Sequence, residues 1–441
     1  MPLMRRCRDA WAAGAWSELR SFAPPCIAQL ILVGLLLPCP SLCAQSPVFT
    51  GQVVDASTGK PVMDALLTVG SIVFKGDDIG HFTVTSGEVV LVRAPGYRAA
   101  RFTGEQVKRG PLRLISFAPH AIYLSAYGAA SKTIRGSAMD IIRDGGANAL
   151  VVDIKSDRGL IPFPSAIPLA KTAGARKLTL IRSLSDLVGE AHARGVYMIA
   201  RIVTFEDPAL GVARPDLAVH LANDTVFHDH QGLAWTDPLQ GEVRAYNIAI
   251  AVEAAKAGFD EVQFDYVRFP DAVTQLKFNG AADEAGRVGA ITTFLKEARA
   301  ALLPYNIFLS VDIFGYVSWN LNDTGIGQQL EELVKNADYI CPMLYPSGFK
   351  YGIPGHKNPM STDEDIYNTV HLTLENSLRR THANPRKFRP WLQAFRDYAF
   401  GGKVFGPGEV ADQTRAANES MTDGWMLWNP RNSYTGIGLT R

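Results

Sequence analysis

From about residue 116 onward, apolar runs alternate with amphipathic stretches along the chain. The apolar runs have the length and composition of buried strands, and they occupy residues 121–127, 149–154, 197–205, 261–269, 307–314, 338–344, 388–395 and 425–428. Stretches with a helical period separate most of them, at residues 132–144, 178–193, 242–257, 282–302, 328–336, 362–380 and 409–421. Along the third stretch, Ile248, Val252, Ala255 and Phe259 form one apolar stripe, which is typical of an amphipathic helix.

Strands that alternate with helices usually pair in parallel. Eight such units over about 325 residues favour a (β/α)8 barrel, or TIM barrel, across residues 116–441. A doubly wound open sheet is the alternative. Only thirteen residues follow Trp428, too few for an ordinary eighth helix, so we expect that end of the barrel to be irregular or covered by the domain before it.

Residues 46–115 have a different pattern, in which short β-rich runs alternate with turn signals such as the segment STGKP at 57–61. This spacing predicts a small N-terminal β-sandwich. The segments GQVVDA at 51–56, TGKPV at 58–62 and APGY at 94–97 resemble the carboxypeptidase-regulatory-like β-sandwich family. That resemblance implies an accessory domain without catalysis of its own. We expect a spacer or docking module, and carbohydrate binding is the alternative.

Residues 1–45 have the order of a secretory signal peptide. Arg5, Arg6 and Arg8 precede an apolar run of eleven residues at 27–37, and prolines and small residues follow up to Ala44. The run is shorter than the roughly 20 apolar residues of a membrane-spanning helix. We therefore expect a secreted or periplasmic protein with no stable membrane span after signal cleavage. The signal holds every cysteine except Cys341, which predicts a mature chain without intramolecular disulfides.

The charge of the chain is nearly balanced, with 44 Lys and Arg against 43 Asp and Glu. A nucleic-acid partner is not expected, because such proteins carry a basic surface. The segment His228-Asp229-His230 is the one metal-like cluster, but no third ligand stands at a suitable spacing. The chain also lacks a phosphate-binding loop and a dinucleotide-binding motif. We expect neither a metal nor a cofactor.

Charged side chains stand at the ends of the expected strands, where TIM barrels carry their active sites. Strand alternation places Asp265 on one face with Gln263 and Val267. A carboxylate in such an apolar strand is costly unless it has a partner, and Arg268 is the nearest cation in the sequence. Asp312 repeats the pattern on the adjacent strand. Two such carboxylates suit glycosidic hydrolysis, as nucleophile and acid or as base and acid. A purely structural Asp–Arg pair is the alternative.

An ordered series of motifs across residues 119–434 resembles the glycosyl hydrolase family filed as domain of unknown function 4015. The most specific is GFDEVQFDYVRFP at 258–270, and it is accompanied by ARIVTF at 200–205, GLAWTDP at 232–238, DIFG at 312–315, GIGQ at 325–328, PMLYP at 342–346 and RPWLQ at 389–393. The resemblance implies a barrel related to α-amylases and α-galactosidases, whose strand-four aspartate is the nucleophile. It therefore assigns that role to Asp265.

The general acid is less closely defined by this resemblance. α-Amylase-like barrels carry the acid on strand five, which favours Asp312, whereas α-galactosidase-like barrels carry it on strand six, which has no carboxylate here. Asp153, Glu206 and Asp397 are the reserve candidates.

Further residues at the strand ends fit a sugar-binding groove. Aromatic rings can stack on pyranose faces, and polar side chains can bind hydroxyls. The candidates are Asp153, Arg201, Trp235, Arg268, Tyr345, Trp391, Gln393, Trp428 and Asn429. We expect a glycoside hydrolase that acts on a polysaccharide or oligosaccharide. A non-catalytic glycan-binding protein and a metal-dependent deacetylase are the alternatives.

Overall fold

The computed structural model describes residues 48–85, 89–272 and 274–439. The expected signal peptide at 1–45 lies outside the described residues. Within the part of the chain that the structure describes, no helix is long and apolar enough to cross a membrane.

Eight parallel strands close into a barrel, in the order β10-β12-β14-β15-β16-β17-β8-β9. Every neighbouring pair is parallel, including β17 with β8, which completes the ring. The predicted TIM barrel is therefore confirmed, and the open sheet is excluded. The strands are β8 (His120–Leu124), β9 (Ala149–Lys155), β10 (Tyr197–Val203), β12 (Glu261–Asp265), β14 (Phe308–Phe314), β15 (Tyr339–Met343), β16 (Trp391–Gln393) and β17 (Trp425–Trp428).

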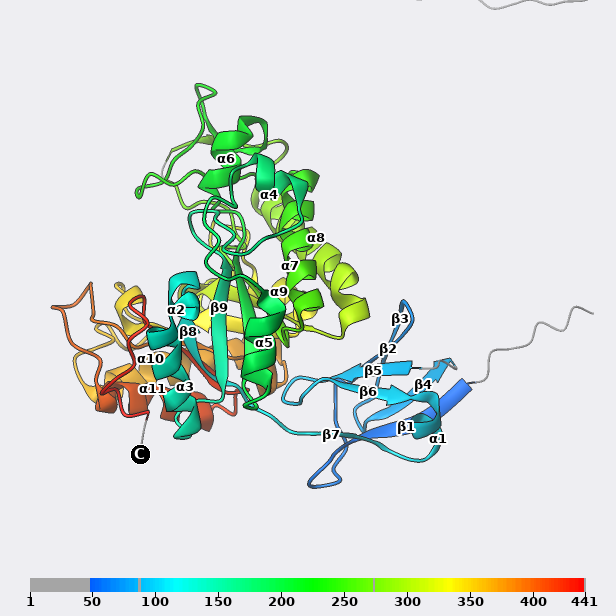
Figure 1. Cartoon of the computed structure of the whole chain (residues 1–441). Helices are drawn as coiled ribbons and strands as arrows, with labels where there is room; N and C mark the ends of the chain where they lie inside the picture. The colour runs from blue at the N-terminus through cyan, green and yellow to red at the C-terminus, as the bar shows by residue number, and fades with distance from the viewer. Residues whose placement is uncertain (1–47, 86–88, 273, 440–441) are drawn as a thin grey trace, which may run out of the picture. The chain divides into compact units, whose positions relative to one another are not determined.

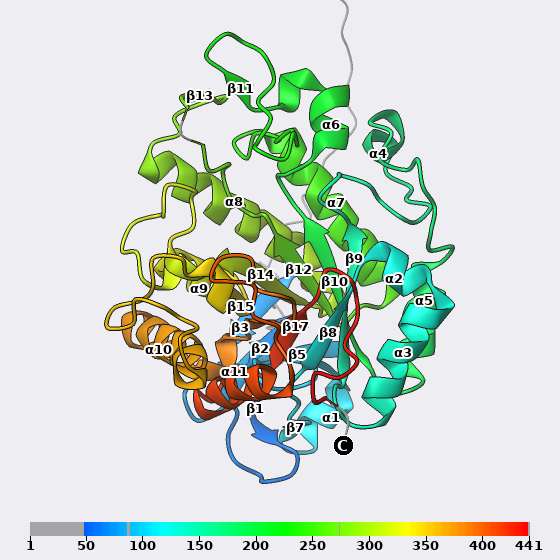
Figure 2. The ribbon, with the colours of Figure 1, turned by 90° about the vertical axis from the view of Figure 1, so that its left-hand side faces the viewer.

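Helices surround the barrel strands (Figure 2). They are α3 (Lys132–Arg143), α5 (Leu184–His192), α7 (Gly241–Ala257), α8 (Glu284–Leu302), α9 (Leu330–Asn336), α10 (Asp363–Thr381) and α11 (Pro407–Glu419). Most begin within two residues of the expected position, but α5 begins six residues later than the pattern predicts. Its preceding segment is irregular, and the backbone N–H groups of Leu180 and Ile181 donate to the Pro162 carbonyl rather than to a helix carbonyl. Ser183 then caps the helix by accepting the N–H of Asp186.

Alternation along the strands divides the molecule into an outer and an inner apolar region. Val262 and Phe264 of β12 belong to the large core between the strands and the helices. Gln263, between them, lies inside the barrel, where its amide contacts Cys341 Sγ at 3.5 Å and Met426 Sδ at 3.3 Å. The next inward residue along β12 is Asp265. The expected face is therefore confirmed for Gln263 and Asp265. It is wrong for Val267, which belongs to the outer core with Val262 and Phe264, because β12 ends at Asp265 and the chain turns at Tyr266.

The last barrel unit has no helix among the described residues after β17. The tail is irregular, as its length predicts, and it packs against the start of the barrel. Tyr434 donates its hydroxyl to the Tyr123 carbonyl at 2.8 Å and accepts the Tyr123 N–H at 3.0 Å. Asn432 Oδ1 accepts the N–H and hydroxyl of Ser125. The tail thus covers the end of β8 without forming a helix.

The N-terminal strands form two small sheets, ordered β4-β1-β7 and β3-β2-β5-β6. One compact apolar core, which includes Val53, Leu67 and Val92, joins them. The strands are β1 (Val48–Asp55), β2 (Leu66–Val69), β3 (Ile72–Lys75), β4 (His81–Thr85), β5 (Val89–Arg93), β6 (Ala100–Thr103) and β7 (Leu112–Leu114), with the short helix α1 (Gly104–Lys108) before β7. Below, these residues are called the β domain.

A buried ion pair joins the β domain to the barrel. Arg93 at the end of β5 lies 3.7 Å from Asp338, which also binds Arg299 at 3.0 Å. Burial opposes ionisation of Asp338, but the positive charges of Arg299 and Arg93 outweigh it and lower its pKa to about 2. Asn306 adds hydrogen bonds to the carbonyls of Val92 and Ala100. These contacts attach the β domain to the barrel at the segments that directly precede β14 and β15.

Long connections extend the barrel beyond the carboxyl ends of β9, β10 and β12. They contain α4 (Pro168–Thr172), α6 (Pro208–Ala213), β11 (His220–Leu221) and β13 (Leu276–Lys277). α4 and α6 project together past the barrel strands in both views, and β11 and β13 lie beside them in the second (Figures 1 and 2). They enlarge the end of the barrel at which the charged strand ends meet.

Candidate active site

Four charged residues meet inside the barrel near the carboxyl ends of adjacent strands. Asp153 comes from β9, Arg201 from β10, Asp265 from β12 and Asp312 from β14. The parallel register sets Arg201 opposite Asp153 on one side, and it sets Val203, two residues further along the same face, opposite Asp265 on the other. All four side chains are buried, with at most 6% of each residue exposed. This charged layer forms the upper end of the barrel interior.

Arg201 is the centre of the charged layer. Its Nη1 donates to Asp153 Oδ1 at 2.6 Å, while its Nε and Nη2 donate to Asp265 Oδ2 at 3.1 and 2.5 Å. The other oxygen of Asp153 accepts the Tyr123 hydroxyl at 2.5 Å. Hydrogen bonds between a guanidinium and a carboxylate are stronger than those between neutral groups, so Arg201 fixes the positions of Asp153 and Asp265.

Asp312 has a different environment from Asp265. Its Oδ1 accepts the indole N–H of Trp391 at 2.8 Å, while its buried Oδ2 has no hydrogen-bond partner. Burial and the charge of Asp265 raise the pKa of Asp312 well above its usual range. A raised pKa favours the protonated form, which a general acid needs.

The two carboxyl groups lie close to one another. Arg201 Nε is 3.1 Å from Asp265 Oδ2 and 3.9 Å from Asp312 Oδ2, so these oxygens are no more than about 7 Å apart. That limit includes the separation of about 5–5.5 Å in retaining glycosidases and the shortest separations, about 6.5 Å, in inverting ones. This upper limit is compatible with either reaction.

The expected partner of Asp265 was wrong. Arg268 is close in sequence, but the guanidinium that binds Asp265 belongs to Arg201, 64 residues away. Arg268 instead lies over the rings of Trp235 at 4.6 Å and Tyr266 at 5.2 Å. The chain turns away directly after Asp265, because Tyr266 adopts a left-handed conformation with φ of 50°. This turn carries Arg268 to the opposite side of the pocket wall.

Tyr266 itself contributes to the position of the candidate nucleophile. A left-handed conformation is uncommon for a bulky residue and costs of order 1 kcal/mol or more. Here it directs the Tyr266 N–H to Asp265 Oδ1 at 2.6 Å. Asp265 thus has hydrogen bonds on both oxygens, one from its own turn and two from Arg201.

A pocket of about 470 Å³ opens above the charged layer. Seven of the predicted site residues line it, namely Arg201, Asp265, Arg268, Asp312, Tyr345, Trp391 and Trp428. Trp428 stacks on Tyr123 with ring centroids 3.9 Å apart and lies edge-on to Trp391. The floor of the pocket therefore combines two carboxyl groups with rigid aromatic surfaces.

Four predicted sugar-binding residues do not line this pocket. Asp153 lies behind Arg201, and Trp235 is buried with its indole N–H donating to Asp229. The Gln393 amide binds Ser347 and the Phe395 carbonyl. The Asn429 amide nitrogen donates to the carbonyls of Ala394 and Ser433. These polar groups have protein partners and support the walls of the site.

The two remaining reserve acids occupy distinct environments. Asp397 accepts N–H groups of Ala399, Phe400 and Gly402, so it holds its own loop. Glu206 is 2% exposed, and its Oε1 has no hydrogen-bond partner. Burial raises the pKa of Glu206 to about 8, and the negative charge of Asp229 adds to this effect. Glu206 is a neutral carboxyl beside the site, but it does not line the pocket.

Several lining residues were not singled out from the sequence as site residues. They are His230, Asp271, Phe314, Thr324, Ile326, Gln328, Met343 and Tyr398. Thr324, Ile326 and Gln328 come from one loop that follows β14, and Asp271 follows Pro270 directly. Phe314 and Met343 are the last residues of β14 and β15, and the others lie in the connections that follow barrel strands. That place in the chain is the sequence signal for them, because such loops form the pocket of a barrel.

His228-Asp229-His230 forms no metal-binding group in the structure. His228 Nδ1 lies 3.1 Å from the Val226 carbonyl, and Asp229 Oδ1 accepts N–H groups of its own loop. Across residues 48–85, 89–272 and 274–439, no group of three or more His, Cys, Asp or Glu side chains is arranged to hold a metal ion.

Comparison with solved structures identifies similar barrels. The PgaB (BpsB) glycoside hydrolase domain from Bordetella bronchiseptica is 14% identical, with a TM-score of 0.52, over 71% of this chain and 95% of that domain. A hypothetical protein from Ruminiclostridium thermocellum is 34% identical over 43% of this chain and 96% of its own, with a TM-score of 0.39. The GH18 chitinase from Cycas revoluta is 11% identical over 73% of this chain and 98% of its own, with a TM-score of 0.45. The likeness to the Bordetella domain shows the shared fold.

Comparison with curated proteins found no match. The family model described as "Putative glycosyl hydrolase domain" matches residues 121–434, which is most of the chain and nearly all of the barrel. The matched span contains the charged layer and every residue that lines the pocket. The chain therefore belongs to this glycosyl hydrolase family, domain of unknown function 4015.

Proposed function

We propose that the protein is a glycoside hydrolase that cleaves O-glycosidic bonds of a polysaccharide or oligosaccharide with Asp265 and Asp312. The observation that carries this proposal is the pair of unlike carboxyl groups at the floor of one aromatic pocket. One of them is hydrogen-bonded by Arg201, and the other lies 3.9 Å from Arg201 and has a pKa raised well above its usual range. Environments that separate the pKa values of two carboxyl groups are how glycosidases divide acid and base roles.

Asp312 is the general acid in this mechanism. It lines the pocket, and its raised pKa keeps a proton available at the pH where Asp265 is the partner of Arg201. The Trp391 indole fixes Asp312 Oδ1, which leaves Oδ2 to carry the proton. Transfer of that proton to the glycosidic oxygen gives the leaving sugar its hydroxyl.

Asp265 acts on the other side of the scissile bond. It attacks the anomeric carbon in a retaining reaction, or it takes a proton from the attacking water in an inverting one. The hydrogen bonds from Arg201 and from the Tyr266 N–H hold its oxygens in place during either step. Asp153 and Tyr123 are positioning residues, because Asp153 binds Arg201 and the Tyr123 hydroxyl donates to Asp153, and neither residue lines the pocket.

The aromatic residues of the pocket bind the sugar rings. Trp428 and Tyr345 are half-buried and line the cavity, so part of each ring faces it. Phe314 and Tyr398 are 40% and 69% exposed, and they line the same pocket. Aromatic faces present apolar surface to the C–H groups of a pyranose, and their polar edges accept or donate hydrogen bonds.

Release of reducing ends from a panel of polysaccharides tests the proposal. Asp265→Asn should abolish release and leave the fold unchanged, while Asp186→Asn, an exposed aspartate of α5, should retain wild-type turnover. Proton NMR of the first anomer formed then distinguishes retention from inversion. Undiminished turnover in Asp265→Asn, or glycan binding by the wild type without any release, would contradict the hydrolase and favour a non-catalytic glycan-binding protein.

We also propose that residues 1–45 direct export to the periplasm or the exterior and that the β domain is a carboxypeptidase-regulatory-like accessory module. Support comes from the order of charged, apolar and small residues in the leader, and from the two-sheet core of the β domain. Mass spectrometry of the mature N-terminus tests the first proposal. An uncleaved chain in the cytoplasmic fraction would contradict it.

A further inference from the structure

Arg268 is held in a fixed position at the wall of the pocket. Its guanidinium carbon lies 4.6 Å from the centre of the Trp235 ring and 5.2 Å from that of Tyr266. Trp235 is itself fixed by its hydrogen bond to Asp229. One guanidinium nitrogen, Nη1, donates to the Phe269 carbonyl at 3.0 Å. Two aromatic rings and one backbone bond therefore orient a half-buried cation that faces the cavity.

This cation has no ionic partner. Among the described residues, no carboxylate lies within 4.0 Å of the Arg268 guanidinium, and its remaining N–H donors bind no protein atom. By contrast, Arg201 is occupied by Asp153 and Asp265. An oriented guanidinium with free donors is a binding site for a planar or tetrahedral anion, because its N–H groups form a fork that fits two oxygens.

The neighbouring acids leave this charge available. Glu206 has a pKa raised to about 8 by burial, so it is neutral near pH 7 despite the proximity of Arg268. Asp271 lines the pocket, but it is exposed at the rim, where solvent and salt screen its charge. Burial and the charge of Asp265 raise the pKa of Asp312 well above its usual range, and Asp265 is bound by Arg201.

We infer that Arg268 forms an anion subsite and that the substrate is an acidic glycan, with a uronic acid carboxylate placed beside the cleaved bond. This inference rests on the proposed hydrolase function and specifies its substrate class. The carboxylate would accept two N–H groups from Arg268, and its sugar ring would lie against the aromatic residues of the pocket. A sulfate ester offers the same pairs of oxygens and is the second source of this chemistry.

Binding is best measured in the Asp265→Asn background, so that no polymer is consumed. Suitable probes are polygalacturonate, alginate and hyaluronan, each compared with its own carboxyl-reduced, neutral form, and dextran sulfate compared with dextran. We expect the acidic form of a bound polymer to lose about tenfold or more in affinity in Arg268→Gln, as removal of a charge-assisted hydrogen-bonded pair predicts. The neutral form should show no comparable change.

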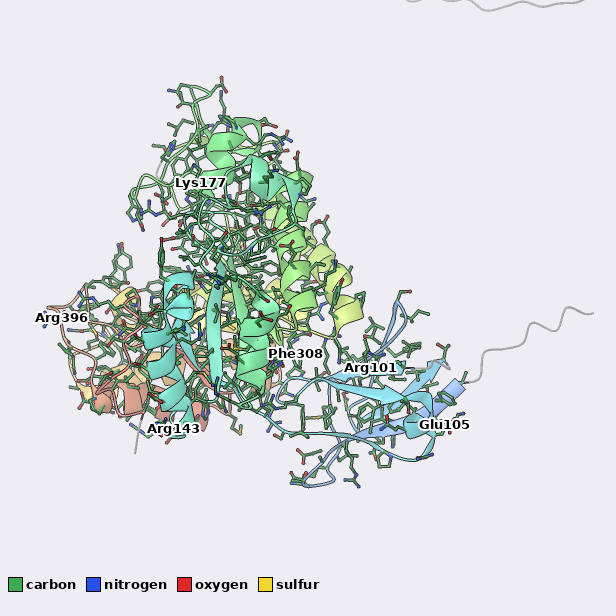
Figure 3. The ribbon with its side chains drawn as sticks, in the orientation of Figure 1. Arg101, Glu105, Arg143, Lys177, Phe308 and Arg396 are labelled. Carbon is green, nitrogen blue, oxygen red and sulfur yellow. The ribbon has the colours of Figure 1, made fainter. Side chains whose placement is uncertain are left out.

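Two control variants separate a specific subsite from general charge. Arg101→Gln removes an exposed arginine of β6 in the β domain (Figure 3) and should leave affinity unchanged. Arg268→Lys keeps the charge but loses the fork and should recover only part of the affinity. Binding of the acidic polymer should also weaken as salt rises, and the Arg268→Gln variant should show a smaller dependence on salt.

The outcomes distinguish this inference from the hydrolase proposal. Hydrolysis of only neutral polymers by the wild-type enzyme, or equal losses on acidic and neutral forms in Arg268→Gln, would overturn the acidic substrate and leave the hydrolase intact. Binding of acidic polymer that depends on Arg268, without release of reducing ends, would overturn the hydrolase and keep the subsite. Preference for dextran sulfate over every uronate polymer would replace the carboxylate with a sulfate ester.

Discussion

A second buried guanidinium, at the opposite end of the barrel from the pocket, gives a quantitative test of the structure. Arg389 is fully buried and donates to Glu261 Oε2 at 2.7 Å and to Asp423 Oδ2 at 3.1 Å. The guanidinium carbon of Arg389 also lies 4.0 Å from the centre of the Tyr339 ring. Glu261 and Tyr339 are the first residues of their strands, so this cluster closes the amino-terminal end of the barrel.

Arg389→Met should destabilise the protein by about 3–5 kcal/mol near neutral pH, because it leaves two buried carboxylates without their cation. Burial already raises the pKa of Asp423, and the charge of Arg389 opposes that rise. In the variant the opposing charge is absent, so the native state retains protons that the unfolded state releases. Stability therefore falls as pH rises, and the deficit should be larger at pH 8 than at pH 5.5.

Equilibrium urea unfolding at these two pH values measures the effect, with reversibility checked first. Arg415→Met is the matched control, because Arg415 makes an exposed ion pair with Asp412 that should contribute about 0–1 kcal/mol. A loss below about 1 kcal/mol in Arg389→Met, or an equal loss at both pH values, would refute the reasoning that the cluster is buried and charged.

The other ionisable groups give three shorter predictions. Asp312→Asn should reduce the rate of cleavage of unactivated glycosides by about 10²–10⁴-fold. The rate on dinitrophenyl glycosides, whose leaving group needs no proton, should fall much less, and equal losses of rate on both substrates would contradict the acid role. Burial raises the pKa of Glu206 from 4.5 to about 8, so the stability of the wild type in urea unfolding should fall as pH rises from 4.5 to 8. Glu206→Gln should show a smaller fall, and parallel stability–pH curves for the two proteins would contradict this prediction. Arg93→Met should lower the free energy of unfolding by about 3 kcal/mol, because Asp338 loses one of its cations. The pKa of Asp338 is lowered to about 2, so the extra stability of the wild type should disappear as pH falls from about 4 toward 2. A stability difference that does not change with pH would be inconsistent with an ion pair.

Most of the fold could be predicted from periodicity alone. The eight strands lie within the apolar runs because each is buried on both faces, between the barrel interior and the helices. The start of α5 was not predictable, because Leu178 and Leu180 fit the helical stripe. In the structure, the N–H groups of Leu180 and Ile181 instead donate to the carbonyl of Pro162, which lies earlier in the same connection between β9 and α5.

The site was only partly predictable, because some of the residues that contact one another in it are far apart in the sequence. Asp265 and Asp312 were recognisable because carboxylates in apolar strands are unusual. The partner of Asp265 depends on the register between β10 and β12. Arg201 lies opposite Gln263, one inward pair before Asp265, and its guanidinium reaches along the barrel to a carboxylate 64 positions later in the sequence. The left-handed turn at Tyr266 is equally invisible in the sequence, and it is what directs Arg268 elsewhere.

The two buried arginine clusters of the barrel show which feature distinguishes chemistry from architecture. At the lower end, Arg389 binds two carboxylates, and none of these three residues lines the pocket above the charged layer. At the upper end, Arg201 likewise binds two, but a third carboxyl, Asp312, lies 3.9 Å from the same guanidinium and faces the cavity. Burial and the charge of Asp265 raise the pKa of this third carboxyl. We therefore propose that a carboxyl in excess of the available cation, lining a pocket, is what distinguishes the upper cluster from the lower one and suits it to proton transfer.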